Sequence, residues 1–405
     1  MNLLFLTVYN LNSIQDSGIY QDLLREFVKK GDHVYVVSPN ERRFGGKTHV
    51  IEEPNCRILQ VKTLNQQKCS MVEKGLGILL LEQQYIQAIK KYFSDVKFDL
   101  VLYSTPPVTF AKVVQFVKTR DNAKTYLLLK DIFPQNAVDL GVLSKTGLKG
   151  FLYRYFRAKE KKLYAISDKI GCMSPANCQY VLEHNPEVSP YKVEVCPNSI
   201  EVRDMSISAE EREHILDKYV LPLDKKIFVY GGNLGKPQGI PFIIECLRSQ
   251  LENPDVFFLI VGDGTEYPKL EAFFEEAKPS NMVLMQSLPK EDYDHMIAAC
   301  DVGLIFLDYR FTSPNFPSRL LSYLQAGLPV LSCTDQATDM GRILEKNQLG
   351  WNCPSNSVKA FSEAVEKASA SVYNAQCGIQ FLQENYDAKQ ACCIICNDME
   401  IVNQM

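Results

Sequence analysis

Long apolar runs are missing from this sequence of 405 residues. No stretch reaches the ~20 consecutive apolar residues that a membrane-spanning helix needs. The first residues, MNLLFLTVYN, lack the charged flank and the length of a signal peptide. These absences exclude an integral membrane protein of the helical kind, and we expect a protein of the cytoplasm.

A large excess of charge of one sign is also missing. The formal net charge is -4, and 23% of the residues are charged. Such a chain has no overall attraction to nucleic acid, so any basic site must be local. The hydrophobic content of 46% is ordinary for a soluble globular protein. The length allows two or three domains, each with a sizeable core.

Metal-binding motifs are scarce, although the sequence contains 13 cysteines. Most cysteines are isolated, and no Cys/His pair with zinc spacing accompanies the one cluster, Cys392, Cys393 and Cys396. We therefore expect reduced thiols, with this cluster packed into a core by a helix. No Asp-x-Asp pair stands at the end of an expected strand, so no metal and no other cofactor is predicted.

The sequence does contain one alternation of expected strands and helices, which is repeated in its two halves. The first half alternates segments of helical period with the β-rich runs NLLFLTV, HVYVVSP, FDLVLYS, KTYLLLK and KIGCMS. The second half repeats the pattern with KIFVYGG, VFFLIVGDG, NMVLMQS, DVGLIFL and LPVLSC. This alternation is typical of parallel sheets with helices on both faces. We predict an α/β fold with two facing, Rossmann-like, doubly wound domains, residues 1–198 and 199–379, and a ligand cleft between them.

The segment GGNLGKPQG, at 231–239, follows an expected strand and precedes an expected helix. Glycines let the backbone approach a ligand, and the first amides of a helix favour an anion. Lys236 adds a point charge. The alternative is a tight corner with no ligand. A second segment, VGDGTEYPKL, lacks the third glycine of a dinucleotide fingerprint, which disfavours NAD binding.

The segment RFTSPNFPSRLLSYLQAGLPVLSC predicts a short helix near the end of another strand. Pro317 suits its first turn and Gly327 its end, and the buried face is formed by Leu320, Leu321 and Leu324. Arg319 would lie at the positive end of this helix. Two helix N-termini, each with a basic side chain, suggest a clamp for a diphosphate. The alternative is a solvated arginine at an ordinary turn.

The first half supplies fewer candidates. Gly18 lies between the first strand and the first helix, where it brings its backbone close to a ligand or simply makes the turn. Lys130 and Asp131 stand at the end of a strand, a position that favours function modestly.

Taken together, these motifs resemble the GT-B retaining glycosyltransferases of family 4, and the resemblance covers essentially the whole chain. Within that family the sequence is most similar to bacterial capsule and O-antigen transferases that use UDP-activated N-acetylated sugars. The motifs that carry the resemblance are the turn at Gly18, KDIFP at 130, CPNSI at 196, YGGNLGKPQG at 230, VGDG at 261 and NFPSRLLSYLQAGLPV at 315.

The resemblance implies that the C-terminal half binds a UDP-sugar, that the N-terminal half faces the acceptor, and that residues 380–405 pack back on the N-terminal domain. It implies transfer with retention and without a metal. The residues that it assigns to catalysis are Lys236, Arg319, Asp131 and Lys130. The residues that it assigns to donor binding are Gly18, Gly231, Gly232, Asn233, Leu234, Gly235, Gln238, Gly262, Ser313, Pro314, Asn315, Phe316, Pro317, Ser318 and Ser322.

The sequence departs from the family pattern in two places. Family members commonly carry two glutamates separated by seven residues, the second of which grips the ribose, and Pro314 and Ser322 stand there instead. A bidentate carboxylate contact to ribose is therefore absent. Many members also have a histidine where Lys130 stands, so we expect electrostatic support rather than a proton shuttle at this position.

Residues 145–162 combine seven Lys/Arg and one Glu with apolar residues at helical spacing. The apolar set is Leu148, Phe151, Leu152, Tyr155 and Phe156. Such a helix suits peripheral binding to an anionic cytoplasmic leaflet, and the acceptor would then be a polyprenyl-pyrophosphate-linked saccharide. The alternative is a core-packing face with solvated charges.

Two other functions remain open at this stage. An epimerase of UDP-N-acetylhexosamines has the same architecture but needs acid/base groups in its cleft. The five histidines lie in expected loops or helices, away from the glycine loops, and they are His33, His49, His184, His214 and His295. A non-catalytic subunit that binds a sugar nucleotide is the third function, favoured by the missing glutamates.

Overall fold

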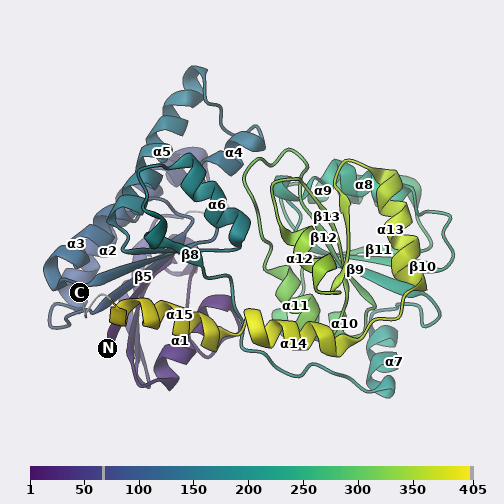
Figure 1. The fold of residues 1–405 in the computed structure, drawn as a ribbon, viewed down its shortest axis with the longest axis horizontal. Helices are drawn as coiled ribbons and strands as arrows, with labels where there is room; N and C mark the ends of the chain where they lie inside the picture. The colour runs from purple at the N-terminus through teal and green to yellow at the C-terminus, as the bar shows by residue number, and fades with distance from the viewer. Residues whose placement is uncertain (66–68, 402–405) are drawn as a thin grey trace. The chain divides into compact units, whose positions relative to one another are not determined.

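The computed structural model describes residues 1–65 and 69–401. The chain forms two compact units, one coloured from purple to teal together with the yellow helix α15, the other from teal to yellow, in Figure 1. The N-terminal unit comprises Met1–Glu201 and Ala388–Met405, and the C-terminal unit comprises Val202–Asp387. Each unit has one sheet covered by helices, which confirms the predicted α/β class with two Rossmann-like domains.

The N-terminal unit contains an eight-stranded sheet in the order β3-β4-β2-β1-β5-β6-β7-β8. Its strands are β1 (Asn2–Leu6), β2 (His33–Glu41), β3 (His49–Glu53), β4 (Cys56–Thr63), β5 (Leu100–Thr105), β6 (Lys124–Leu129), β7 (Lys169–Cys172) and β8 (Val193–Val195). Its helices are α1 (Ile19–Lys29), α2 (Met71–Tyr92), α3 (Ala111–Asp121), α4 (Gln135–Asp139), α5 (Gly147–Ile166), α6 (Pro175–His184) and α15 (Ala388–Ile401), with short 3-10 turns η1 (Arg42–Phe44) and η2 (Pro190–Lys192).

The sheet of this unit departs from the predicted parallel arrangement at one edge. β3 pairs with β4 in the antiparallel sense, whereas the other strands of the sheet pair in parallel. Because β3 lies at the edge, its side chains are only partly buried, and its sequence HVIEE lacks the continuous apolar run that marks a central strand. The same lack of a long apolar run explains why β8 was not predicted.

The C-terminal unit contains a six-stranded parallel sheet in the order β11-β10-β9-β12-β13-β14. Its strands are β9 (Lys226–Asn233), β10 (Val256–Asp263), β11 (Met282–Met285), β12 (Val302–Phe306), β13 (Val330–Thr334) and β14 (Gly350–Pro354). Its helices are α7 (Ala209–Lys218), α8 (Ile240–Arg248), α9 (Tyr267–Ala277), α10 (Lys290–Ala298), α11 (Arg319–Gln325), α12 (Met340–Lys346), α13 (Val358–Ala370) and α14 (Ala375–Asn385), with a 3-10 turn η3 (Lys236–Gln238).

The order of the strands indicates where a ligand site is expected in the C-terminal unit. β9 is the first strand of this sheet in the chain, and it lies between β10 and β12. The chain therefore winds outward in one direction from β9 to β11 and in the other from β12 to β14. Open α/β sheets bind ligands at such a switch point, outside the carboxyl ends of the strands. The glycine loop that follows β9 lies at this point.

Helix α15 completes the core of the N-terminal unit at the end of the chain. Cys392, Ile395 and Cys396 are buried in the cluster that contains Leu24 and Phe27 of α1. Two of the three clustered cysteines thus occupy core positions in a helix, as predicted, whereas Cys393 is exposed.

Candidate active site

The glycine loop lies between β9 and α8, which confirms the predicted strand–loop–helix order. Gly232 and Gly239 have φ angles of 119° and 66°, in the left-handed region that favours glycine. The side-chain oxygen of Gln238 accepts a hydrogen bond from the Gly235 amide at 3.1 Å. This bond holds the loop in one shape. Lys236 is exposed at the start of η3.

Two glycines are required because other groups occupy the space of their missing side chains. A Cβ atom on Gly262 would lie 2.0 Å from the carbonyl oxygen of Gly232, so β10 could not run beside the loop. A Cβ atom on Gly231 would lie 1.8 Å from the hydroxyl oxygen of Tyr293 on α10. These glycines therefore serve close packing around the loop and not only a turn in the chain.

The guanidinium of Arg319 lies next to Gly232 of the glycine loop and to Tyr230, which precedes the loop. Its guanidinium carbon is 4.4 Å from the centroid of the Tyr230 ring, at the range of a cation–π contact. A Cβ atom on Gly232 would be 3.5 Å from its Nη2 atom. Its Nη1 atom is buried and has no hydrogen-bond partner in the described part of the chain. The predicted alternative of a solvated arginine is therefore wrong for this nitrogen.

Three tyrosines, Tyr230, Tyr293 and Tyr323, lie near this guanidinium, and we call them the tyrosine collar. The Tyr230 hydroxyl donates to the Asn233 carbonyl at 2.8 Å. The Tyr323 hydroxyl accepts from the Gly231 amide at 3.0 Å and donates to the Leu304 carbonyl at 3.2 Å. Burial raises the pKa of all three phenols, that of Tyr323 to about 12, so the collar is neutral at physiological pH.

Sequence reasoning missed the collar. Tyr230 ends a strand, Tyr293 belongs to a polar helix and Tyr323 lies on the buried face of α11, and none of these local patterns marks a site. The helix itself agrees with the prediction, since Leu320, Leu321 and Leu324 are buried and Gly327 has a φ of 75° after its end. It starts at Arg319, however, after Pro317, and it has only seven residues. A helix of this length offers little dipole, so the charge of Arg319 is the main feature here.

The segment 313–318 is held in place by contacts with Thr338 and Tyr386. The Thr338 hydroxyl donates to the Asn315 carbonyl at 2.6 Å. Phe316 is buried and stacks on Tyr386, with ring centroids 6.0 Å apart. Ser313 and Pro314 are buried, Pro317 and Ser322 are half-buried, and Ser318 is exposed.

The side chains of Phe316 and Leu234 both face the interior, Leu234 as part of the core. Donor contacts at these two predicted positions would therefore come from the backbone.

In the N-terminal unit, a cluster of polar residues lies at the carboxyl ends of β5 and β6. The Thr105 hydroxyl accepts from the Lys130 amide at 3.1 Å, and the Tyr20 hydroxyl donates to Ser104 at 3.0 Å. Burial raises the pKa of Asp131 to about 6. Burial also lowers the pKa of Lys130 to about 8, opposed by the nearby thiols of Cys196 and Cys172. Both groups thus titrate near neutrality, which the sequence did not indicate for Lys130.

Gly18 is the N-cap of α1 and has an extended backbone, with a φ of 165°. A Cβ atom there would meet only the flexible end of the Gln21 side chain, at 2.5 Å. The conformation of Gly18 therefore does not itself require glycine, and its approach to a phosphate stays a prediction.

Three further observations bear on the alternatives. His33 begins β2, in the predicted run HVYVVSP, and His49 begins β3, so neither lies in a loop or a helix. Within residues 1–65 and 69–401, no group of three or more His, Cys, Asp or Glu side chains is arranged to hold a metal ion. Every helix in the same ranges is too short or too polar to cross a bilayer.

Comparison with known proteins places this geometry in a class. Residues 211–374, most of the C-terminal unit, match the family described as Glycosyl transferases group 1. The chain is 22% identical to the probable glycosyltransferase WbjE of Pseudomonas aeruginosa over 364 residues, 87% of this chain and 88% of that protein. It is 24% identical to the putative colanic acid biosynthesis glycosyl transferase WcaI of Escherichia coli K12 over 61% of this chain and 60% of that protein.

The fold agrees with this class. The crystal structure of Anabaena HepE in complex with UDP-glucose superposes with a TM-score of 0.68 and 14% sequence identity, and the match covers 100% of both chains. Structures similar to this chain include glycosyltransferases of the GT-B fold, so the two Rossmann-like units have the GT-B fold. The matched family and relatives support a transferase enzyme that moves a glycosyl group.

Proposed function

We propose that the protein is a retaining glycosyltransferase of family 4 that transfers a sugar from a UDP-sugar to a polyprenyl-pyrophosphate-linked saccharide in bacterial surface polysaccharide synthesis. The sugar is an N-acetylated hexosamine or a deoxyhexosamine, and the reaction takes place at the cytoplasmic face of the membrane. The name of WcaI supports the polysaccharide pathway. The UDP-glucose bound to HepE supports a uridine diphosphate donor.

The observation that carries this proposal is the unpaired charge of Arg319 beneath the glycine loop. An arginine makes up to five hydrogen bonds, and a buried N–H group without a partner is unfavourable. In the described part of the chain Arg319 makes no ion pair, and its Nη1 atom makes no hydrogen bond. A diphosphate above Gly232 would supply the missing negative charge. The Nη1 atom is shielded from water, which strengthens that interaction.

The chemistry requires this charge more than it requires a nucleophile. When the bond between the anomeric carbon and UDP breaks, negative charge develops on the diphosphate, and preorganised donors stabilise it. Two side chains would stabilise this charge. They are Arg319, next to Gly232, and the exposed Lys236, within the loop. The acceptor hydroxyl then attacks the face that the diphosphate leaves, and a phosphate oxygen takes its proton. Configuration is retained and no metal takes part.

The experiment is thermal unfolding of the purified protein with UDP, GDP, dTDP, ADP and their sugars, each with and without magnesium. We expect a shift of the melting temperature with UDP and with one UDP-N-acetyl sugar, equal in the two conditions. Incubation with that donor and a lipid-linked acceptor then yields UDP and the extended saccharide. A larger shift with another nucleotide, or a shift that needs magnesium, would contradict the proposal.

Binding of a UDP-sugar without turnover on any lipid-linked acceptor would favour the non-catalytic subunit. That function is supported by the positions of the two replaced glutamates, because Pro314 is buried and has no carboxylate to offer. Interconversion of UDP-N-acetylhexosamines without an acceptor would instead favour the epimerase.

A further inference from the structure

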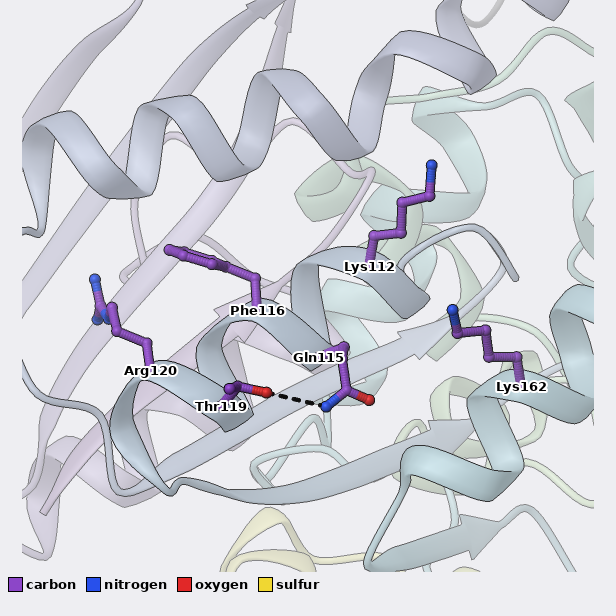
Figure 2. A pocket seen from close by; sticks show the side chains of 6 residues that line it. All are labelled: Lys112, Gln115, Phe116, Thr119, Arg120 and Lys162. Carbon is purple, nitrogen blue, oxygen red and sulfur yellow. Dashed lines mark hydrogen bonds between the residues drawn. The ribbon is translucent and has the colours of Figure 1, made fainter.

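A cavity of about 450 Å³ lies between α3 and α5 in the N-terminal unit and is shown in Figure 2. It is lined by Lys112, Gln115, Phe116, Thr119, Arg120 and Lys162. Lys112 and Lys162 are exposed, and Arg120 pairs with Asp121 at 2.7 Å. Water or a carboxylate therefore already stabilises these charges. Arg319 differs, because its Nη1 atom is shielded from water and has no hydrogen-bond partner in residues 1–65 and 69–401.

In the C-terminal sheet, the central strands β9 and β12 separate near Arg319. β9 pairs with β10 as far as Asn233, but with β12 only as far as Val229, which faces Gly303. One further step in this register would join the Gly231 amide to the Leu304 carbonyl, because the slanted bonds of a parallel ladder connect an amide to the residue before its partner. The pairing of β9 with β12 ends before this bond.

The Tyr323 hydroxyl of α11 occupies the place of this ladder bond. It accepts from the Gly231 amide at 3.0 Å and donates to the Leu304 carbonyl at 3.2 Å. Both backbone groups are satisfied, but the oxygen between them keeps them further apart than the ~2.9 Å of a direct bond. The ring fits because a glycine faces it, since a Cβ atom on Gly303 would lie 2.4 Å from the ring. Tyr323 therefore holds the two strands apart at the switch point.

The same helix carries Arg319, which precedes Tyr323 by four residues and so lies on the same side of α11. Its guanidinium carbon is 4.4 Å from the centroid of the Tyr230 ring, and its Nη2 atom is 3.5 Å from the position of a Cβ atom on Gly232. The two side chains of α11 thus contact three consecutive residues of β9, and the Tyr323 hydroxyl is bonded to the middle one, Gly231. A shift of this hydroxyl would move α11 relative to β9, and the guanidinium with it.

We propose that Tyr323 is a positioning residue of the donor site, whose hydroxyl replaces a ladder bond between β9 and β12 and fixes Arg319 at the distance from the glycine loop that a diphosphate requires. Tyr323 does not itself touch the donor, because its hydroxyl is bonded on both sides and its ring is fully buried. This inference rests on the proposed contact between Arg319 and the diphosphate, and it names the residue that holds Arg319 in place for that contact.

The test is calorimetric titration of the full-length protein with UDP and with UMP, which lacks the β-phosphate. We expect the wild type to bind UDP more tightly than UMP. Tyr323→Phe keeps the ring on Gly303 and removes only the hydroxyl. It should lower the preference for UDP about 10-fold, as the weakening of one hydrogen bond to a charged group does, without changing the number of sites. A loss of folded protein alone would lower the number of sites and not the preference.

Three further variants connect this effect to its cause. In Arg319→Met the preference for UDP should disappear, and adding Tyr323→Phe should not lower it again, because Tyr323 acts through Arg319. Gly303→Ala displaces the ring while the hydroxyl stays in the chain, and its preference should fall as well. The matched control is Tyr164→Phe, which removes another fully buried hydroxyl, bonded to Glu160 at 2.8 Å in the N-terminal unit. This control should keep the wild-type preference.

Hydrogen exchange provides a second measurement of the same bond. A peptide that spans residues 228–234 should contain an amide that exchanges at least ~10-fold faster in Tyr323→Phe than in the wild type, since the Gly231 amide loses its acceptor. Unchanged exchange would show that the hydroxyl does not hold this strand.

The outcomes separate this inference from the proposed function. A wild-type preference for UDP in Tyr323→Phe, together with its loss in Arg319→Met, would overturn the positioning role and leave the proposed function standing. The same conclusion would follow from an equal loss in Tyr164→Phe, or from a wild-type preference in Gly303→Ala. A wild type that binds UMP as tightly as UDP would overturn the proposed function and this inference together.

Discussion

Arg319 is a half-buried residue whose Nη1 atom has no hydrogen-bond partner in the described part of the chain. Burying an unpaired charge is unfavourable, so replacing it with an apolar side chain of similar length should stabilise the unliganded protein. We expect Arg319→Met to raise the free energy of unfolding by ~1–3 kcal/mol, to abolish the UDP-dependent thermal shift and to lower turnover by orders of magnitude. Thermal unfolding with and without UDP, and initial rates, measure these effects.

Arg310 provides the matched control for Arg319, since it lies in the same unit and its guanidinium binds both oxygens of the Asp308 carboxylate at 2.8 and 2.7 Å. Arg310→Met leaves that buried carboxylate without its charged partner and should lower the melting temperature. A fall in stability for Arg319→Met together with a preserved UDP shift would contradict the proposed role of Arg319.

Lys130 and Asp131 predict a pH profile. Burial raises the pKa of Asp131 to about 6 and lowers the pKa of Lys130 to about 8. If both act in their charged forms, kcat/KM falls below pH 6 as Asp131 gains a proton, and above pH 8 as Lys130 loses one. Lys130→Arg should move the alkaline limb upward by more than two pH units, because an arginine stays charged. Lys124→Arg, at the start of the same strand, should leave the profile unchanged. An alkaline limb that does not move would exclude Lys130 as its source.

At the scale of elements, the packing of β10 against the glycine loop predicts different results for two glycines. In Gly262→Ala the new methyl group meets the Gly232 carbonyl, and backbone cannot yield as a side chain does. We expect a loss of ~1–3 kcal/mol in unfolding free energy and weaker UDP binding. Gly18→Ala meets only the end of the Gln21 side chain, so its melting temperature should stay near that of the wild type. Chemical denaturation and UDP titration compare the two. Equal stabilities of the two variants would show that the loop adapts to the methyl group.

At the scale of the whole molecule, the last helix of the chain, α15, packs into the core of the N-terminal unit. Ile395 is fully buried between elements from both ends of the chain, and Ile395→Ala should cost ~2–5 kcal/mol in the N-terminal unit. Hydrogen exchange should show the loss of protection in Met1–Glu201 and not in Val202–Asp387. UDP should increase protection around the glycine loop in both the variant and the wild type. The exposed neighbour Cys393, replaced by alanine, is the control, and equal effects of the two substitutions would contradict this packing.

Some features of this protein follow from a few adjacent residues, and the sequence determined these. The strands of the two sheets were predicted where continuous apolar runs mark burial on both faces, as in FFLIV of β10 and LLFL of β1. The glycine loop and the end of α11 at Gly327 were predicted because backbone conformations with positive φ favour glycine whatever surrounds them. The place of Arg319 at the start of a short helix was predicted from the buried face that follows it.

Other features depend on which elements pack together, and only the tertiary structure decided them. The tyrosine collar joins residues from β9, α10 and α11 that lie up to 93 positions apart, and each has an ordinary local pattern. The antiparallel pairing of β3 follows from its place at the sheet edge. The apolar residues of α5 fit a core or a surface equally well in sequence, because periodicity defines a face of a helix but not its neighbour. The core of the N-terminal unit takes the last turns of α5, through Leu163 and Tyr164, and the apolar residues of its first turns stay exposed.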